Sequence, residues 1–573
     1  MKLKYQSFRL GPWVCLLMLG CYLHFEADLQ FTSWMLIFPS IALIGFTKLQ
    51  VGVGGLWTIL YSISVVVMGI GIAEWSRVEV LESGDYSSVV EVQTFEKRRG
   101  NRLVYTSEEL QSGLKIELLT DTNTHFTPGN VLHVKGWNAG FKPSVYPFQF
   151  DEKRFAQIRG TSGKVYVKSA EMLGGQLHLS TRQHLLNRVN KWPVSHRTRS
   201  FYAAMLLGDK SKVDRDDKQA FATSGLVHVL AVSGLHVGLI ALFLEKLTFM
   251  LKRHRVIRLL LILTGIWCFV WISGASVSVV RAGLLFTFVQ IARLTGRRGV
   301  TAEAVWTAAA ILVCLNPITI FDLGFQLSFA AVFGIVYGHT LIDQWLRHIE
   351  LSKPTRFVLS SASVSFWAQW STSAITLYHF HQFPTYFLLS NVLFLPFIPL
   401  LLILGILVML MDVSGLSIAF VWRSTDFLVN GFFAGVRWLS EWPGALVSSI
   451  FISSTLAWAV AFGFILVIIS LRKRWKYTTV IGILLPFTIL PIDNHSGIWH
   501  HQDGITSAIE VQSGSVSTFY SEDEKALDGI QYGSSKWLES RGVDSIRFES
   551  ILLPSLDLDS NFYSENHENL VFE

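Results

Sequence analysis

Charged residues are scarce in this chain. Asp, Glu, Lys and Arg make up 16% of its 573 residues, whereas hydrophobic residues make up 51% and the mean hydropathy is +0.41. A soluble globular chain carries about 25% charged residues. The composition therefore argues against a large soluble enzyme.

The short motifs that mark several redox and enzyme classes are also missing. The four cysteines form no CxxC pair, so neither a zinc site nor a disulfide framework is indicated, and we expect no metal and no other cofactor. No GxxxxGK[ST] motif occurs, so the chain shows no sign of a phosphate-binding loop for ATP. One function to consider is a membrane-embedded hydrolase with Ser233 as nucleophile and His236 as base. The absence of a GxSxG motif argues against it.

Long apolar runs are what the chain has instead. A run of about 20 residues crosses a bilayer as a helix. Several of the runs are short, so we predict about 11–13 transmembrane or re-entrant helices. The candidate runs are 11–25, 31–47, 51–73, 226–250, 257–273, 277–294, 301–316, 325–342, 357–379, 385–411, 415–434, 451–470 and 477–492.

Basic residues cluster in the loops between these runs. The clusters lie at the N-terminus and at 252–258, 293–298, 347–356 and 472–476. All of them fall on one side when the N-terminus is cytoplasmic, as expected for Lys and Arg in short cytoplasmic loops. We therefore predict a multi-pass membrane protein with a cytoplasmic N-terminus and with the segments 74–200 and 494–573 outside the cytoplasm.

The net charge of +6 hides three different blocks. Residues 74–199 hold 18 basic and 13 acidic residues, residues 494–573 hold 4 basic and 14 acidic residues, and the remaining, hydrophobic part holds 26 basic and 15 acidic residues. This division predicts N-terminal helices over 1–73, an outer domain over 74–200, a transmembrane domain over 201–493 and an acidic tail over 494–573.

The outer domain has the pattern of β structure. Alternating runs at 87–92, 115–119, 131–136, 164–167 and 176–179 predict about five strands, which suits a small OB-like barrel or a sandwich. Basic residues are interleaved with rings such as Tyr105, which is typical of a face that binds a nucleic-acid strand. A solvated β domain with ordinary basic residues is the alternative. The candidate binding residues are Lys97, Arg98, Arg99, Arg102, Lys135, Trp137, Lys142, Lys153 and Arg154.

Polar residues interrupt the apolar run at 226–250. Such groups inside a membrane segment indicate a water-lined path or a partner helix. Ser233 and His236 are three residues apart and share a helix face, and His228 lies about 80° from His236 around the axis. Packing against backbone or serine partners is the alternative for both histidines.

Four blocks in this region resemble a known family. They are LLGDKS (206–211), SGLVHVLAVSGLHVGL (224–239), SGASVSVVRAG (273–283) and LNPITIFDLGFQLSFAA (315–331). In this order they resemble the ComEC-type competence proteins, and the resemblance covers about 20–500.

The resemblance implies a channel that imports single-stranded DNA across the cytoplasmic membrane during natural transformation. It also implies the partners: single-stranded DNA, membrane lipid, a DNA receptor, a cytoplasmic ATP-driven motor and single-strand-binding proteins. A transporter of another anionic polymer or lipid is the main alternative.

The blocks supply the candidate residues of the channel. We expect Arg281 to engage phosphate, with Asp322 or Asp209 holding Arg281 or the histidines in place. An ordinary interhelical ion pair between Arg281 and Asp322 is the alternative. The full candidate set is Asp209, His228, Ser233, His236, Arg281, Asp322, Gln326 and Ser328.

The C-terminal region departs from the family. The family's C-terminal nuclease domain begins with a motif of the form LDVGQGDA. The matching stretch of this chain is IEVQSGSV at 509–516. The metal-binding motif of that nuclease has the form THxDxDH. The nearest stretch of this chain is LPSLDLDS (553–560), in which serines replace both histidines. Two-metal hydrolysis needs several His and Asp ligands. We expect a degenerate nuclease remnant without catalysis, so that a separate nuclease would act; an unrelated acidic tail is the alternative.

Overall fold

The structure is a computed structural model of the chain. It describes residues 10–27, 56–76, 80–99, 102–121, 125–141, 151–174, 181–251, 253–294, 301–448, 450–473, 478, 481–482, 496–503, 506–513, 516–521 and 545–550. The chain divides into two compact units. The first comprises Met1–Gly140, Ala156–Ile375 and Phe383–Val447, and the second comprises Phe141–Phe155, Thr376–Gln382 and Ser448–Glu573.

The first two described helices form a close pair. They are α1 (Gly11–Ala27) and α3 (Leu56–Trp75). A β-carbon at Gly20 would overlap the carbonyl oxygen of Val66, and the Cys21 thiol donates to the Gly69 carbonyl at 3.3 Å. Small residues allow this close approach of two apolar helices, as is common in membranes.

The β domain is a closed barrel of five strands with the order β1-β2-β3-β5-β4, and β1 also pairs with β4. Only the pair β3–β5 is parallel. Residues alternate between the interior and the surface along β4, and the interior holds apolar side chains such as Val90, Ile116 and Leu132. The strands are β1 (Gly84–Arg99), β2 (Arg102–Glu109), β3 (Lys115–Asp121), β4 (Val131–Asn138) and β5 (Thr161–Gly174), with the helix α4 (Glu152–Arg159) before β5.

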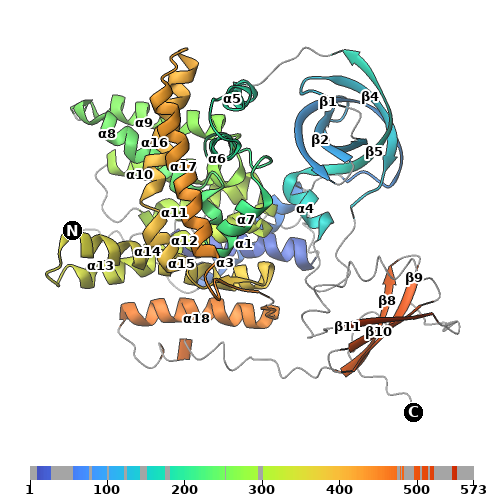
Figure 1. Cartoon of the computed structure of the whole chain (residues 1–573). Coiled ribbons are helices and arrows are strands. Elements are labelled where there is room, and N and C mark those ends of the chain that lie inside the picture. The colour runs from blue at the N-terminus through green and yellow to red at the C-terminus, as the bar shows by residue number, and fades with distance from the viewer. Residues whose placement is uncertain are drawn as a thin grey trace. The chain divides into compact units, whose positions relative to one another are not determined.

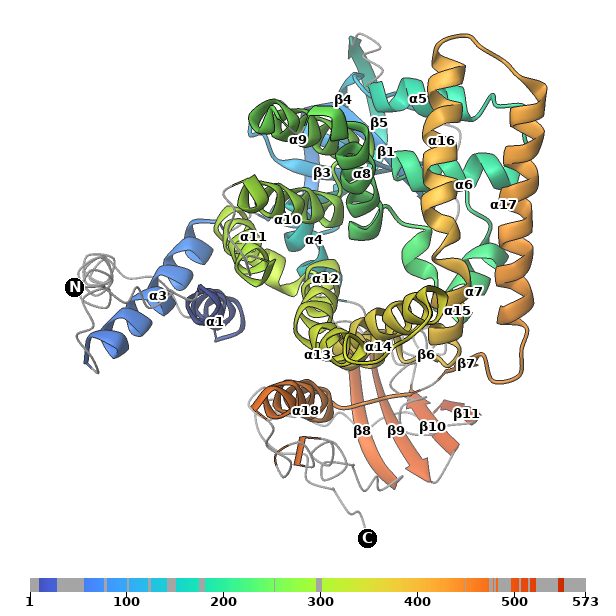
Figure 2. The same ribbon diagram turned by 90° about the vertical axis from the view of Figure 1, so that its left-hand side faces the viewer.

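A second group of helices surrounds α6, whose side chains from Ser200 to Leu207 are all buried. A helix that is buried on all sides belongs in the interior of a bundle. The elements of this part are α5 (Thr181–Val189), α6 (His196–Leu207), α7 (Arg215–Thr223), η2 (Val227–Val229), α8 (Gly234–Leu247), η3 (Phe249–Leu251), α9 (Arg255–Ile272) and α10 (Val277–Leu294). In Figures 1 and 2, α8, α9 and α10 lie side by side, and each packs on the other two.

The remaining helices of the first unit include two irregular spans. The π-helical turn η5 continues α12 into α13, and the helices α15 and α16 are bent by 47° at Leu395 and Pro396. The elements are α11 (Thr301–Leu315), η4 (Pro317–Phe321), α12 (Leu323–Phe333), η5 (Gly334–His339), α13 (Thr340–Leu346), α14 (Lys353–Phe380), β6 (Phe383–Pro384), α15 (Phe387–Phe394), α16 (Phe397–Val413), α17 (Ala419–Ser440) and β7 (Leu446–Val447); the last five residues of α14 belong to the second unit.

The described part of the second unit includes an apolar helix and a small sheet. The helix is α18 (Ser454–Lys473). The sheet has the order β11-β10-β9-β8, and β10 and β11 are parallel. Its strands are β8 (Ser496–Asp503), β9 (Thr506–Ser513), β10 (Val516–Ser521) and β11 (Ser545–Ser550).

Four helical segments of the described chain are long and apolar enough to cross a membrane, and the bent pair α15–α16 makes up to five. They are Arg255–Ile272, Val277–Leu294, Leu323–Leu346 and Ser454–Leu471, and shorter apolar helices lie at Tyr61–Trp75 and Ala302–Leu315. The predicted fold class, a helical membrane protein with a small barrel domain, is confirmed. The total of 11–13 spans stays a prediction, because 31–47 and most of 477–492 lie outside the described residues.

One predicted span is wrong. The run 226–250 contains the short turn η2, and a helix of only 14 residues begins at Gly234. The backbone at Ser233 is extended, with a φ of −127° and a ψ of 172°, which interrupts a helix within the run, and Ser233 caps the new helix. In the barrel, β2 was not anticipated, and the predicted strand at 176–179 lies outside the described residues.

Candidate functional site

The four family-like blocks meet in the first unit. Gly208 ends α6 with a φ of +71°, and a β-carbon there would overlap the carbonyl oxygen of Ser273 and lie 3.8 Å from the Val232 side chain. A β-carbon at Gly234 would lie 3.7 Å from that of Ala282. Arg281 of the third block in turn contacts Asp322 of the fourth, so the four blocks are linked through successive contacts, and we call this region the block junction.

Ser233 and His236 form the N-terminal cap of α8 within the block junction. The backbone N–H of Ser233 donates to His236 Nδ1 at 3.1 Å, and the Ser233 hydroxyl lies 3.0 Å from the same nitrogen. Because Nδ1 accepts, the neutral ring carries its proton on Nε2. That nitrogen is buried, and within the described part of the chain it has no hydrogen-bond partner. The imidazole thus has one donor to spare.

This geometry does not favour a hydrolase. A catalytic base needs its second nitrogen oriented by a third group, usually a carboxylate. Nδ1 already accepts the Ser233 backbone N–H, and no carboxylate of the described residues bonds to Nε2. The serine and histidine are therefore arranged as a helix cap.

Arg281 is buried in α10, and its side chain is only 3% exposed. Nη1 lies 3.6 Å from Asp322 Oδ1, and Nη2 donates to the Gly324 carbonyl at 2.6 Å. Nε and Nη1 have no hydrogen-bond partner among the described residues. The interhelical contact between Arg281 and Asp322 is thus present, but it leaves part of the guanidinium without an acceptor.

Asp322 has a second contact. Its side chain caps α12 by accepting from the backbone N–H of Phe325 at 2.6 Å. The following turn is held by Gln326, which donates to the Ile320 carbonyl at 2.9 Å, whereas Ser328 lies half-buried on the same helix. The carboxylate that faces Arg281 is therefore fixed by the start of its own helix.

Two further candidates lie at the edge of this region. Asp209 accepts from the backbone N–H of Ser211 at 3.0 Å and forms no bond to Arg281 or to either histidine in the described structure. His228 is half-buried in η2. Of the two carboxylates that were expected to hold Arg281, the structure brings Asp322 to it.

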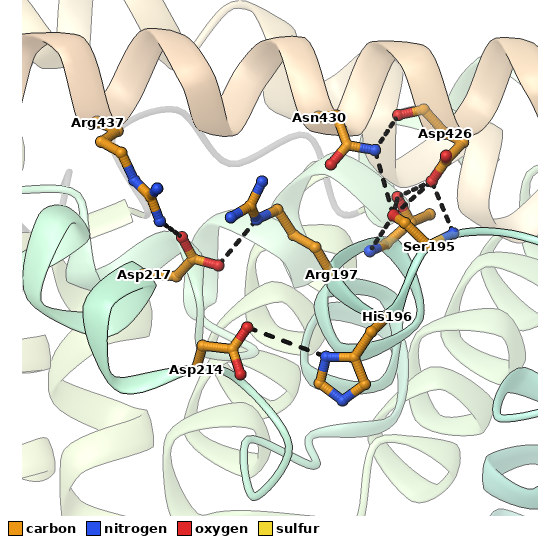
Figure 3. A network of polar contacts seen from close by, with 9 residues as sticks. Ser195, His196, Arg197, Asp214, Asp217, Asp426, Asn430 and Arg437 are labelled. Atoms are coloured by element: carbon orange, nitrogen blue, oxygen red, sulfur yellow. Dashed lines mark hydrogen bonds and ion pairs between the residues drawn. The ribbon is translucent and has the colours of Figure 1, made fainter.

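A second polar cluster, which sequence reasoning missed, joins α6 and α7 to α17 (Figure 3). Asp217 on α7 is buried and accepts from Arg197 Nε at 2.9 Å and from Arg437 Nη2 at 2.8 Å. The Arg197 guanidinium also lies 5.6 Å from the ring centre of Phe433. Two cations thus share one buried anion.

The same cluster continues at the start of α6. Asp426 Oδ1 accepts from the Ser195 backbone N–H at 3.0 Å and from the hydroxyls of Ser195 and Thr198, both at 2.6 Å. Asn430 donates to the Ser195 hydroxyl at 3.2 Å. We call these contacts of Asp217 and Asp426 the α17 network.

A sequence signal for the α17 network existed. Asp426 is an ionisable residue inside the predicted span 415–434, and Asn430 and Arg437 follow at intervals of four and seven residues. These intervals place all three on one helix face. Nothing in the sequence pairs that face with Arg197 or Asp217, however.

The barrel carries a face of rings and cations. The exposed Arg102 lies 4.5 Å from the ring centre of Tyr166, whereas Lys164, whose Nζ lies 5.8 Å from the same ring, is buried. Trp137 is exposed and stands opposite Tyr166 in the pairing of β4 with β5. Rings and cations in this arrangement suit the stacking of bases beside neutralised phosphates. Tyr166 was not among the predicted residues.

The other predicted barrel residues are scattered. Lys135 is exposed on β4, and Lys153 and Arg154 lie on α4. Lys97, Arg98 and Arg99 form the end of β1, whereas Lys142 lies outside the described residues. Tyr105 was expected on the binding face, but it is only 1% exposed because the alternation along β2 turns it into the barrel.

Comparison with known proteins gives two matches. Residues 205–475 match the family model described as "Competence protein". The ComE operon protein 3 of Bacillus subtilis (strain 168) is 32% identical over 219 residues, which is 38% of this chain but only 27% of that protein. No solved structure matches the chain. The resemblance to ComEC-type competence proteins is confirmed by these matches.

Proposed function

We propose that this membrane protein, which matches the competence protein family over residues 205–475, is a channel that imports single-stranded DNA during natural transformation. The observation that carries the proposal is the block junction. It contains a buried arginine with unused donors and a histidine with an unused donor, on two apolar helices that pack against each other. Polyanions need such a polar route through an apolar slab.

Arg281 is the residue that we assign to phosphate. A buried guanidinium with two nitrogens that have no hydrogen-bond acceptor is costly unless a ligand or water supplies the acceptors. Arg–phosphate contacts are strong and directional. Asp322 acts on this residue as a positioning group, because its carboxylate is held by the first turn of α12.

The barrel is the proposed outer binding domain, with an OB-like strand order and the face formed by Arg102, Trp137 and Tyr166. The proposal includes the predicted orientation, with the N-terminus in the cytoplasm and the barrel and tail outside the cytoplasmic membrane. The proposed pathway also includes a DNA receptor outside the cytoplasmic membrane, and an ATP-driven motor and single-strand-binding proteins in the cytoplasm.

The C-terminal sheet is proposed to be a nuclease remnant without activity. The stretch 509–516, which stands where the family's nuclease motif begins, crosses from β9 to β10. The stretch 553–560, with its two serines, lies outside the described residues. The chain is accordingly a transport protein, and a separate nuclease would degrade the second strand.

The test is transformation of a competent host whose own channel gene is deleted and replaced by this one. The full chain should restore uptake of labelled DNA, and Arg281→Gln should lower it at least about tenfold, the effect of losing one strong charged contact. Arg423→Gln is the matched control, since Arg423 is an exposed arginine of α17 outside the block junction.

Equal uptake in wild type and Arg281→Gln, at equal protein level, would refute the role of Arg281. Failure of the full chain to restore uptake, with the protein present in the membrane, would favour a transporter of another anionic polymer or lipid.

A further inference from the structure

A cavity of about 390 Å³ lies in the first unit where α8 and α10 end and α9 begins. Its polar wall consists of Glu245 on α8, Arg255 and Arg258 on α9, and Gln290 and Arg293 on α10. The cavity is separate from both the block junction and the α17 network, and neither of them uses any of its residues.

The wall has a surplus of positive charge. Glu245 is its single carboxylate, and it bonds to both Gln290 and Arg293. Three arginines therefore face one acid, which leaves two positive charges without a counter-charge among the residues that line the cavity. An anion is the ligand that balances this surplus.

The arginines also have donors to spare. Arg258 is fixed by the Glu245 carbonyl at 3.0 Å and by the Thr248 hydroxyl at 3.4 Å through Nη2 and Nε, so its Nη1 is left for a ligand. Arg255 makes no hydrogen bond or ion pair to any described residue. One guanidinium is thus pre-positioned and a second is unengaged, which suits a phosphate with several acceptor oxygens.

The other residues that line the cavity are apolar, and they indicate which kind of phosphate compound would fit. Leu259, Ile262 and Leu294 line it, and none of the lining side chains is aromatic. Val256 and Leu260, on the first turns of α9, are exposed. Bases would find no ring to stack on, whereas acyl chains would find apolar surface next to the phosphate.

We propose that this cavity binds the phosphate headgroup of an anionic membrane phospholipid between the ends of α8, α9 and α10. Basic pockets between membrane helices are known to select such headgroups. The bound lipid would tie together three helices, two of which carry residues of the block junction. The proposal holds whether or not the chain imports DNA.

The test uses native mass spectrometry of the full chain in detergent with equal amounts of phosphatidylglycerol and phosphatidylcholine. Wild type should retain phosphatidylglycerol in preference, and Arg255→Gln should lower its affinity about fivefold, the effect of one basic residue at a lipid surface. Glu245→Gln keeps the hydrogen bonds of the wall but removes its negative charge, so it should raise the affinity by a similar factor.

Arg253→Gln is the matched control, because Arg253 is an exposed arginine two residues away that does not line the cavity. Unchanged retention of phosphatidylglycerol in both Arg255→Gln and Glu245→Gln would overturn the proposal. Displacement of the lipid by oligothymidine would assign the cavity to nucleic acid instead. Displacement by inorganic phosphate at the lipid's own concentration would assign it to free phosphate.

Discussion

Two arginine–carboxylate sites in the same helical unit differ in how fully their charges are paired. In the α17 network, the buried Asp217 accepts from two arginines at 2.8 and 2.9 Å. In the block junction, the buried Arg281 faces one carboxylate at 3.6 Å and keeps two nitrogens without a hydrogen-bond partner in the described chain. We call the first site saturated, because its charged groups have hydrogen-bonded partners, and the second unsaturated, because part of its guanidinium has none.

From this difference we infer that the α17 network stabilises the fold, whereas the block junction is arranged to bind a ligand. A saturated network stabilises the fold because each member satisfies the others, and a missing member leaves a charge uncompensated. An unsaturated buried cation lowers stability and persists where a ligand completes it. The following predictions test this division, first at the saturated site and then at the unsaturated one.

The largest loss of stability is expected from Asp217→Asn. It removes the anion that Arg197 and Arg437 share, and we expect a loss of about 2–3 kcal/mol in the free energy of unfolding, since both guanidiniums are partly exposed and regain some hydration. Thermal unfolding of the detergent-solubilised chain measures it. The control is Asp214→Asn, whose exposed carboxylate lies 4.0 Å from His196 and should change stability by less than about 0.5 kcal/mol. Equal losses in the two variants would contradict the division.

A smaller loss is expected from Asp426→Asn. One oxygen of Asp426 accepts three hydrogen bonds from Ser195 and Thr198, and a neutral amide accepts them more weakly. We expect a loss of about 1–1.5 kcal/mol in the same unfolding measurement. Uptake should fall only as far as the amount of folded protein falls. A specific loss of uptake at normal protein level would instead place Asp426 in the DNA path.

Asp322→Asn should separate stability from transport at the unsaturated site. Asn caps a helix as well as Asp does, so α12 keeps its start and the loss of stability should stay below about 1 kcal/mol. Uptake should nevertheless fall, because Arg281 loses the carboxylate that positions it. The control is Asp343→Asn, which breaks an exposed pair with Arg347 at 2.6 Å on α13. A full uptake signal in Asp322→Asn would remove the positioning role.

The smallest effect is expected at a carboxylate in the barrel. Partial burial raises the pKa of Glu109, but the hydrogen bonds from Ser112 and Tyr86, together with the nearby Ser88 hydroxyl, outweigh it and hold the pKa below its ordinary value of 4.5. A lowered pKa stabilises the fold above the ordinary value, and this contribution is lost as the pH falls through the lowered one.

The matching variant is Tyr86→Phe, which removes the bond from Tyr86 to Glu109 at 3.2 Å. We expect a loss of about 0.5 kcal/mol at neutral pH, which shrinks as Glu109 becomes protonated. Hydrogen exchange of the barrel amides, compared between wild type and Tyr86→Phe, measures the loss of stability at neutral pH and at acidic pH. A difference that grows on acidification would show that the carboxylate is not the group involved.

Much of the helical fold was predictable from hydropathy. The run 277–294 coincides with α10, and 257–273 lies within two residues of α9 at each end, because neither run contains a backbone break. The predicted span 226–250 was wrong because hydropathy does not register the extended backbone and helix cap at Ser233.

The candidate site was predictable only in part. Motif order was enough to group Ser233, His236, Arg281 and Asp322 as one set. The α17 network was not, because Asp217 and Arg437 are 220 residues apart and only the packing of α7 on α17 unites them. Periodicity places a residue on a helix face, but it does not reveal which other face lies opposite.

The contact between Ser195 and Asp426 has a consequence for how the protein is made. These residues are separated by 231 positions, so the ribosome finishes most of the membrane domain before the partner of Ser195 exists. At roughly 5–20 residues per second, this interval lasts on the order of tens of seconds. During that time the start of α6 lacks its acceptor and Asp217 lacks Arg437. Synthesis of α17 is therefore the step that supplies the missing partners of α6 and α7, and a chain that ends before Arg437 would keep only Arg197 of the two arginines that bind Asp217.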